Sequence, residues 1–159
     1  MLVWDEATAL LLLLSAPLSA ALLAATLGRR APVLTARFGS LSAGTGFLLA
    51  AGLAVSAARG EGVTIGTSVF VFGADRLAVT VLLLIFGVST VAQAFAVRYL
   101  AGDSRAWWFT AGAGLLTTAS AVMATATTIV GVAVGWTAAG VALCLLLGTY
   151  WHLENARDG

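Results

Sequence analysis

The sequence contains very little charge. Only 9% of its 159 residues are Asp, Glu, Lys or Arg, whereas 60% are hydrophobic. A soluble domain carries roughly 25% charged residues, because its surface must face water. With a mean hydropathy of +1.02, this chain lacks the polar surface that a soluble fold requires. We therefore predict an integral membrane protein that contacts the lipid bilayer.

Further shortages exclude whole classes of chemistry. All eight basic residues are arginine, so no lysine amine is available for a Schiff base or for a tunable buried ammonium. One histidine and one cysteine cannot form a metal site with three or four ligands, and Cys144 alone cannot form an intrachain disulfide. The net charge of +1 does not support a nucleic-acid partner. We expect no cofactor and no metal.

Long apolar segments predict the fold class. One crossing of a bilayer needs about 20 apolar residues. The longest uncharged run, Trp107 to Trp151, holds roughly 45, so we expect it to fold back once, in a tight turn at Thr125 to Thr128. We predict a single all-α membrane domain over residues 1–159, a bundle of about five transmembrane helices. The predicted spans are 7–27, 39–58, 76–98, 106–124 and 127–149.

The first predicted span has an alternative interpretation as a cleaved signal peptide. Ser19-Ala20-Ala21 resembles a small-residue cleavage site. However, Asp5 and Glu6 precede the apolar run where a signal peptide has basic residues. Arg29 and Arg30 follow it like a stop-transfer flank. These flanks favour a retained helix.

The second span and its surroundings differ in composition from the first. Pro32 lies among three arginines, which predicts a short polar connection up to Arg37. The span that follows, 39–58, is rich in Gly, Ala and Ser, so it should face protein more than lipid. Gly44 and Gly46 are candidates for close helix packing.

Residues 59–72 predict a change from helix to strand. β-branched and aromatic side chains flank the central Gly66, Thr67 and Ser68. Such a pattern favours a short β-hairpin between helices 2 and 3, and an irregular loop is the alternative. We expect the hairpin outside the hydrocarbon, because lipid cannot satisfy an open strand edge.

Few polar residues lie within the predicted spans. Gln93 is the strongly polar residue of the third span, and we expect it to hydrogen-bond a neighbouring helix, with a place in a water-filled path as the alternative. His152 follows two aromatic residues, which favours snorkelling at the interface over proton handling. All seven acids fall in loops or at segment ends, whereas ion pumps place ionisable groups inside the membrane. The hydroxyl of Thr137 does not ionise near neutral pH.

The distribution of arginines predicts an orientation. We expect the chain in the cell inner membrane. By the positive-inside rule, its N-terminus should lie outside and its C-terminus in the cytoplasm. This orientation requires an odd number of spans, in agreement with five. The predicted cytoplasmic side holds Arg29, Arg30, Arg37, Arg98, Arg105 and Arg157, and the opposite side holds Arg59 and Arg76.

Four segments carry a family resemblance. The first segment resembles a Phe-x-x-Asp-x-Leu entry into a third helix, and it reads Phe72-Gly73-Ala74-Asp75-Arg76-Leu77. The second resembles a Tyr-Met-x-x-Asp turn that ends this helix, and it reads Arg98-Tyr99-Leu100-Ala101-Gly102-Asp103. Gly135-Trp136-Thr137-Ala138-Ala139-Gly140-Val141-Ala142-Leu143-Cys144 resembles a Gly-Trp-Glu-x-x-Gly-x-x-Ser segment in a fifth helix. Leu147-Gly148-Thr149-Tyr150-Trp151 resembles a closing Ile-Gly-Phe-Trp. These motifs are typical of the antiporter-like membrane subunits of respiratory complex I (NADH-quinone oxidoreductase subunit L, or chain 5) and of multisubunit cation/proton antiporters.

The resemblance implies a membrane subunit of a complex I-like or antiporter-like assembly, one that contributes to the ion-translocating arm without pumping alone. The family's helix-five glutamate falls at Thr137, and the helices that carry its partner lysine are absent from a sequence ending at Gly159. We therefore expect no catalytic residue, and partner membrane subunits that include a chain supplying those helices. As an enzyme component, the chain would be at most a non-catalytic subunit of an NADH-quinone oxidoreductase-like complex. The candidate structural or polar positions are Asp75, Arg76, Gln93, Gly135, Trp136 and Thr137.

Other interpretations of the chain stay open. It could be a structural or assembly protein, the energising subunit of an inorganic-carbon uptake complex, or a gene fragment without a role. The intact spans and the consistent arginine asymmetry disfavour the fragment.

Overall fold

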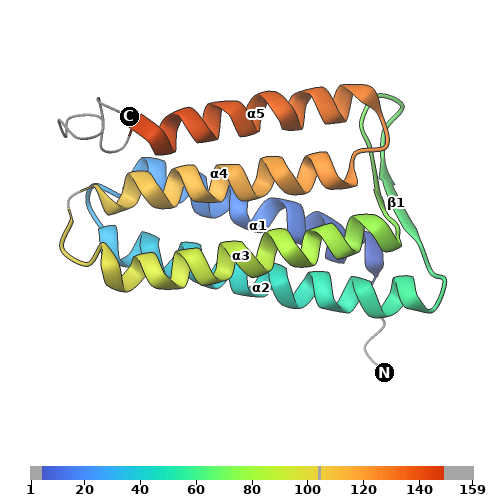
Figure 1. The fold of residues 1–159 in the computed structure, drawn as a ribbon, viewed down its shortest axis with the longest axis horizontal. Coiled ribbons are helices and arrows are strands. Elements are labelled where there is room, and N and C mark those ends of the chain that lie inside the picture. Colours follow the sequence, from blue (N-terminus) through green and yellow to red (C-terminus); the bar gives the residue numbers. More distant parts are fainter. Residues whose placement is uncertain (1–4, 104, 149–159) are drawn as a thin grey trace.

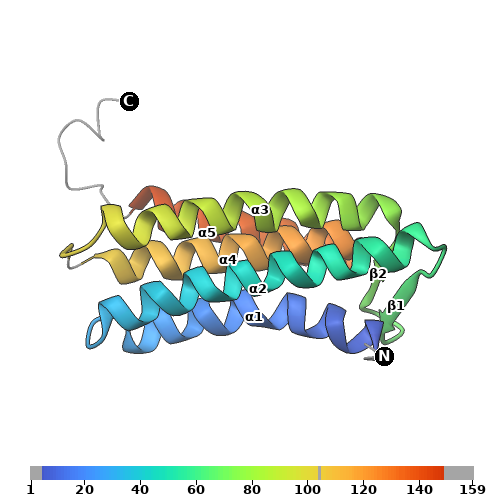
Figure 2. The same ribbon diagram turned by 90° about the horizontal axis from the view of Figure 1, so that it is seen from below.

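The computed structural model describes residues 5–103 and 105–148, and within them it shows five helices and one hairpin (Figure 1). The helices run up and down along one long axis. The α1–α2 and α3–α4 connections therefore lie at one end, and the hairpin and the α4–α5 turn at the other (Figures 1 and 2). The predicted all-α bundle with a hairpin between helices 2 and 3 is confirmed. The elements are α1 Glu6–Leu27, α2 Pro32–Ala58, β1 Val63–Gly66, β2 Val71–Ala74, α3 Arg76–Tyr99, α4 Ala106–Thr125 and α5 Ile129–Gly148.

Helix α4 lies in the middle of the bundle, where it contacts the other four helices. Of the described helices, α1, α2, α3 and α5 are long and apolar enough to cross a membrane. Helix α4 is not among these four, since Thr, Ser and Gly make up much of its sequence. A helix enclosed by protein does not need a lipid-compatible surface. Its composition therefore fits its central position.

The apolar core is centred on Phe86, Leu10, Leu13 and Leu82, all fully buried. The Phe86 ring lies directly against Gly46 of α2, where a methyl group would overlap it. Gly46 is thus a close-packing position, as predicted. Gly44 is not, because a methyl group there would meet open space.

Helix α2 begins earlier than we predicted. Pro32 occupies its first turn, so Arg37 lies in the second turn of the helix and the polar connection ends at Ala31. The prediction of a connection up to Arg37 is wrong. A proline fits the first turn of a helix, because its φ is already helical and its missing N–H has no partner to lose there.

The hairpin is antiparallel, and Val63 pairs with Ala74 while Gly66 pairs with Val71. Its second strand is not an open edge. The carbonyl of Val71 accepts hydrogen bonds from the backbone N–H (2.9 Å) and the hydroxyl (3.0 Å) of Thr127, in the α4–α5 turn. The Thr128 hydroxyl donates to the Val69 carbonyl at 3.0 Å. These bonds attach the hairpin to the start of α5, and they show why the turn there is rich in threonine.

Candidate functional site

The buried polar side chains of the described residues are six alcohols and one amide. Each alcohol donates to a backbone carbonyl three or four residues earlier in its own helix, which is how serine and threonine satisfy themselves within a helix. Such groups can orient a water but do not ionise near neutral pH. The set is Thr35, Ser42, Gln93, Thr110, Thr117, Thr118 and Thr125.

Gln93 is the amide, and it lies where α2, α3 and α4 meet. Its Nε2 donates to Ser89 Oγ at 3.0 Å, one turn earlier in α3. Ser89 Oγ in turn lies 2.7 Å from Thr117 Oγ1 of α4. The prediction that Gln93 bonds a neighbouring helix is therefore wrong in detail, because the connection to α4 passes through Ser89. We had not predicted Ser89 or Thr117, although the spacing of four residues between Ser89 and Gln93 places them on one helix face.

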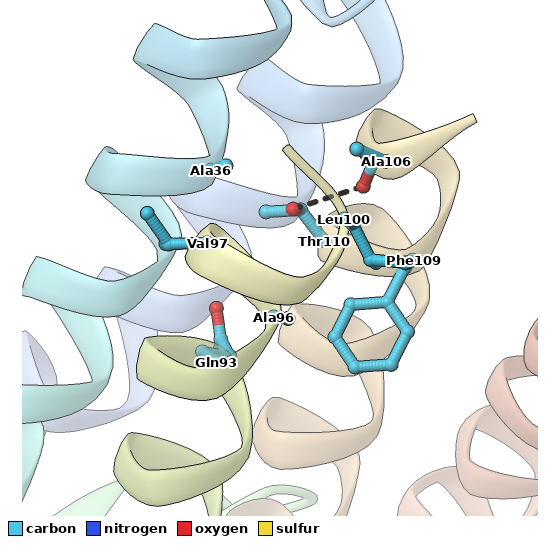
Figure 3. Close-up of a pocket in the computed structure, with 8 residues that line it drawn as sticks. All are labelled: Ala36, Gln93, Ala96, Val97, Leu100, Ala106, Phe109 and Thr110. Atoms are coloured by element: carbon cyan, nitrogen blue, oxygen red, sulfur yellow. Dashed lines mark hydrogen bonds between the residues drawn. The ribbon is translucent and has the colours of Figure 1, made fainter. Parts of the chain in front are cut away.

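The Oε1 atom of Gln93 has no hydrogen-bond partner within the described part of the chain. Gly39 makes room for it, because a methyl group at that position would lie 2.6 Å from this oxygen. Beside the amide is a cavity of about 10 Å³, close to the space that one water molecule needs. Figure 3 shows Gln93 at this cavity with Ala36 of α2 and Thr110 of α4. The cavity is too small for a larger ligand.

The segment Gly135-Trp136-Thr137 points in more than one direction. Gly135 faces α4, where an added methyl group would lie 3.0 Å from Met123 Cβ and 3.1 Å from the Ala119 carbonyl. Trp136 is 72% exposed, and Thr137 is exposed as well. The Thr137 hydroxyl donates to the Ala133 carbonyl of its own helix at 2.9 Å. Thr137 therefore takes no part in the hydrogen bonds that join Gln93, Ser89 and Thr117. The structure does not bring the candidate residues Gln93 and Thr137 together.

Asp75 and Arg76 stabilise the junction between the hairpin and α3. Asp75 is the N-cap of α3, and its carboxylate accepts a hydrogen bond from the Ala78 N–H at 2.7 Å. The Arg76 Nε donates to the Ala57 carbonyl, in the last turn of α2, at 3.2 Å. Both side chains are exposed. Their contacts are structural.

Replacing Asp75 with alanine should lower the free energy of unfolding by about 1 kcal/mol, because the first turn of α3 loses its capping oxygen. The measurement is equilibrium unfolding in mixed micelles of a mild detergent and a denaturing one. Asp75→Asn keeps a capping oxygen without the charge, so it should retain most of the stability. An equal loss in both variants would show that the carboxylate acts through its charge instead.

The geometry and composition define a class of protein, a multi-pass membrane protein. Among its described residues, the buried polar side chains are hydroxyls and one amide. Residues 63–110 match the family described as NADH-ubiquinone oxidoreductase (complex I), chain 5 N-terminus. The matched segment contains the hairpin, α3 and the start of α4. The predicted resemblance to the N-terminal part of the antiporter-like subunits is therefore confirmed there. No match to the chain was found among curated proteins.

Two of the four predicted motifs lie inside the matched segment, namely 72–77 and 98–103. The motif at 135–144 lies beyond it, and the assignment of Thr137 to the family's glutamate position stays a prediction. The closing motif extends past Gly148, and Tyr150, Trp151 and His152 lie outside the described residues. Among the residues that the structure does describe, no group of His, Cys, Asp and Glu side chains could hold a metal ion.

Proposed function

We propose that the chain is a membrane subunit of a complex I-like or cation/proton antiporter-like assembly. The observation that carries this proposal is the match of residues 63–110 to the chain 5 N-terminus. The fold supports the proposal. Within the matched segment the hairpin leads directly into α3, and hydrogen bonds attach the hairpin to the α4–α5 turn. In this proposal the chain contributes to the ion-translocating membrane arm.

The polar side chains of the interior support the proposal that this chain contributes to ion translocation in an assembly but does not pump protons alone. A proton path through a membrane needs groups that can bind and release protons, and intramembrane ionisable residues mark such paths. Every buried polar side chain in the described ranges is a threonine, a serine or Gln93. A water held near Gln93 would be oriented, but it would have no ionisable neighbour among these side chains. The ionisable groups of an active path would then belong to a partner.

We further propose that another chain packs on the outer side of α5. Only Gly131, Gly135 and Ala142 of this helix are buried, while Trp136 and Leu147 are each 72% exposed. Since lipid alone could also cover an apolar face, the support for a protein partner comes from the family resemblance. We place the chain in the cell inner membrane with its N-terminus outside, which the arginine asymmetry favours.

The experiment is purification of the tagged chain from its native membrane in mild detergent, followed by identification of the proteins that accompany it. We expect antiporter-like membrane subunits in stoichiometric amounts. Purification of the chain by itself, as a stable homo-oligomer, would contradict the proposal.

A second candidate function is structural support or assembly of such a complex. The observation that favours it is the exposed, non-ionisable Thr137 at the position that we assign to the family's glutamate. Deletion of the chain distinguishes the two functions. A complex that assembles without the chain and translocates ions at the normal rate would exclude both functions. A complex that assembles but translocates slowly favours the first, and one that fails to assemble favours the second.

A further inference from the structure

A groove of about 520 Å³ lies between α2 and α3, near the end of the bundle that carries the α1–α2 and α3–α4 connections. Leu41 of α2 and Phe95 of α3 give it apolar walls, and Ser40 adds a hydroxyl. Leu41 is 67% exposed and Phe95 is 64% exposed. The apolar part of the groove therefore opens to the surroundings of the bundle.

Two arginines border the same groove, Arg37 from the second turn of α2 and Arg98 from the last turn of α3. Both are exposed. Within residues 5–103 and 105–148, neither guanidinium has a carboxylate or a hydrogen-bond acceptor from the protein. Arginine presents a planar array of donors that matches the oxygens of a phosphate. The groove thus combines apolar walls with two unpaired donors for an anion.

Aromatic residues show the depth at which the arginines lie. Tyr99 is 74% exposed and stacks on Phe95, with ring centroids 5.3 Å apart. At the same end of the bundle, the Arg29 guanidinium lies 5.2 Å from the centre of the Trp107 ring. Exposed Tyr and Trp side chains gather at the headgroup level of a bilayer. By this rule we place the arginines at headgroup level, with the apolar walls extending from there toward the acyl chains.

A second groove provides a contrast. It lies between α1 and α2, has a volume of about 620 Å³ and is lined by apolar side chains such as Leu12 and Leu48. The ionisable residue that borders it is Glu6, and it has no arginine. An acyl chain could fill either groove. Only the α2–α3 groove offers a counter-charge for an anionic headgroup.

From this combination we propose that the α2–α3 groove is a binding site for an anionic phospholipid. The phosphate is held by Arg37 and Arg98, and one acyl chain lies along Leu41 and Phe95. The proposal does not depend on the function proposed above, since it uses only the bundle and its membrane location. Basic pockets between transmembrane helices are a known way to recognise anionic headgroups.

The test is titration of the purified chain, in neutral detergent, with phosphatidylglycerol and with phosphatidylcholine of identical acyl chains, followed by native mass spectrometry. We expect phosphatidylglycerol to bind at least about tenfold more tightly. The double variant Arg37→Gln/Arg98→Gln should lower its affinity by about thirtyfold, from about 1 kcal/mol for each arginine near the headgroups. Arg59→Gln is the matched control, because Arg59 is an exposed arginine at the opposite end, and it should leave the affinity unchanged.

Two further experiments distinguish binding of the whole lipid from binding of phosphate alone. Leu41→Ser should weaken phosphatidylglycerol binding, and inorganic phosphate at equal concentration should not displace the lipid. The proposal is overturned if the two lipids bind equally, if Arg59→Gln has the effect of the double variant, or if inorganic phosphate competes as well as the lipid. If the double glutamine variant does not fold, Arg37→Lys/Arg98→Lys replaces it, and an affinity equal to that of the unmodified chain then counts against the paired guanidinium contact.

Discussion

Replacing Gly46 with alanine is expected to lower the free energy of unfolding by about 2 kcal/mol, the typical cost of overpacking a filled core. The reason is the Phe86 ring, which lies against the Gly46 backbone and is fully buried. A new methyl group overlaps the ring, and because the ring is fully buried, it can move away only by displacing other side chains of the core. The overlap outweighs the gain of about 1 kcal/mol that alanine brings over glycine in a helix.

Gly44 provides the matched control, because it lies two residues earlier in the same helix and nothing lies within 4 Å of an added methyl group. There, alanine should be neutral or stabilising by up to about 1 kcal/mol. Equilibrium unfolding in mixed micelles measures both variants. A double-mutant cycle with Phe86→Leu, which shortens the side chain, should recover part of the loss at Gly46. Equal effects at Gly44 and Gly46 would contradict the packing that the structure shows.

Much of the fold could be predicted from the sequence because the bilayer sets the length of each helix. Apolar runs of about 20 residues separated by charges define the spans, and the long run without charge implies a fold-back near Thr125. The hairpin was predictable from its β-branched and aromatic residues. The start of α2 was not, because arginines suggested a loop while Pro32 in fact begins the helix.

The packing faces were harder to predict, because a chain this rich in glycine and alanine gives little amphipathic signal. Gly44 and Gly46 are indistinguishable in the sequence, yet only Gly46 faces a bulky neighbour. The Gln93 contact shows the same difficulty. A buried amide in lipid must find a partner, but the choice of Ser89 in its own helix depends on rotamers and on the position of Thr117.

The exposure of Thr137 follows from helix geometry once one neighbour is placed. Successive residues in an α-helix are rotated by about 100°, so a glycine that faces α4 turns the next two side chains away from it. Gly135 faces α4, and Trp136 and Thr137 therefore face outward. The sequence motif identifies these three residues together but does not show which of them meets the bundle. If another chain covers α5, Thr137 is placed to meet that chain.

Replacing Thr137 with glutamate should therefore be costly in the chain alone and tolerated in its assembly. Thr137 lies near the middle of α5 on its exposed side, where an ionisable residue in lipid costs about 3 kcal/mol. That cost corresponds to roughly a hundredfold lower ratio of folded, inserted chain to misfolded chain. The measurement is the amount of folded chain recovered from membranes, with and without the partner that co-purifies.

Val141→Glu is the control, because Val141 is 51% exposed and lies one turn further along the same side of α5. Alone, both variants should be recovered poorly. With the partner chain, we expect recovery of Thr137→Glu but not of Val141→Glu, because the proposed family assignment puts an acid at position 137 and not at position 141. Recovery of both variants would indicate a partner surface that is merely polar. Recovery of neither would show that the outer side of α5 faces lipid in the assembly, and it would remove the basis for assigning Thr137 to the position of the family's acid.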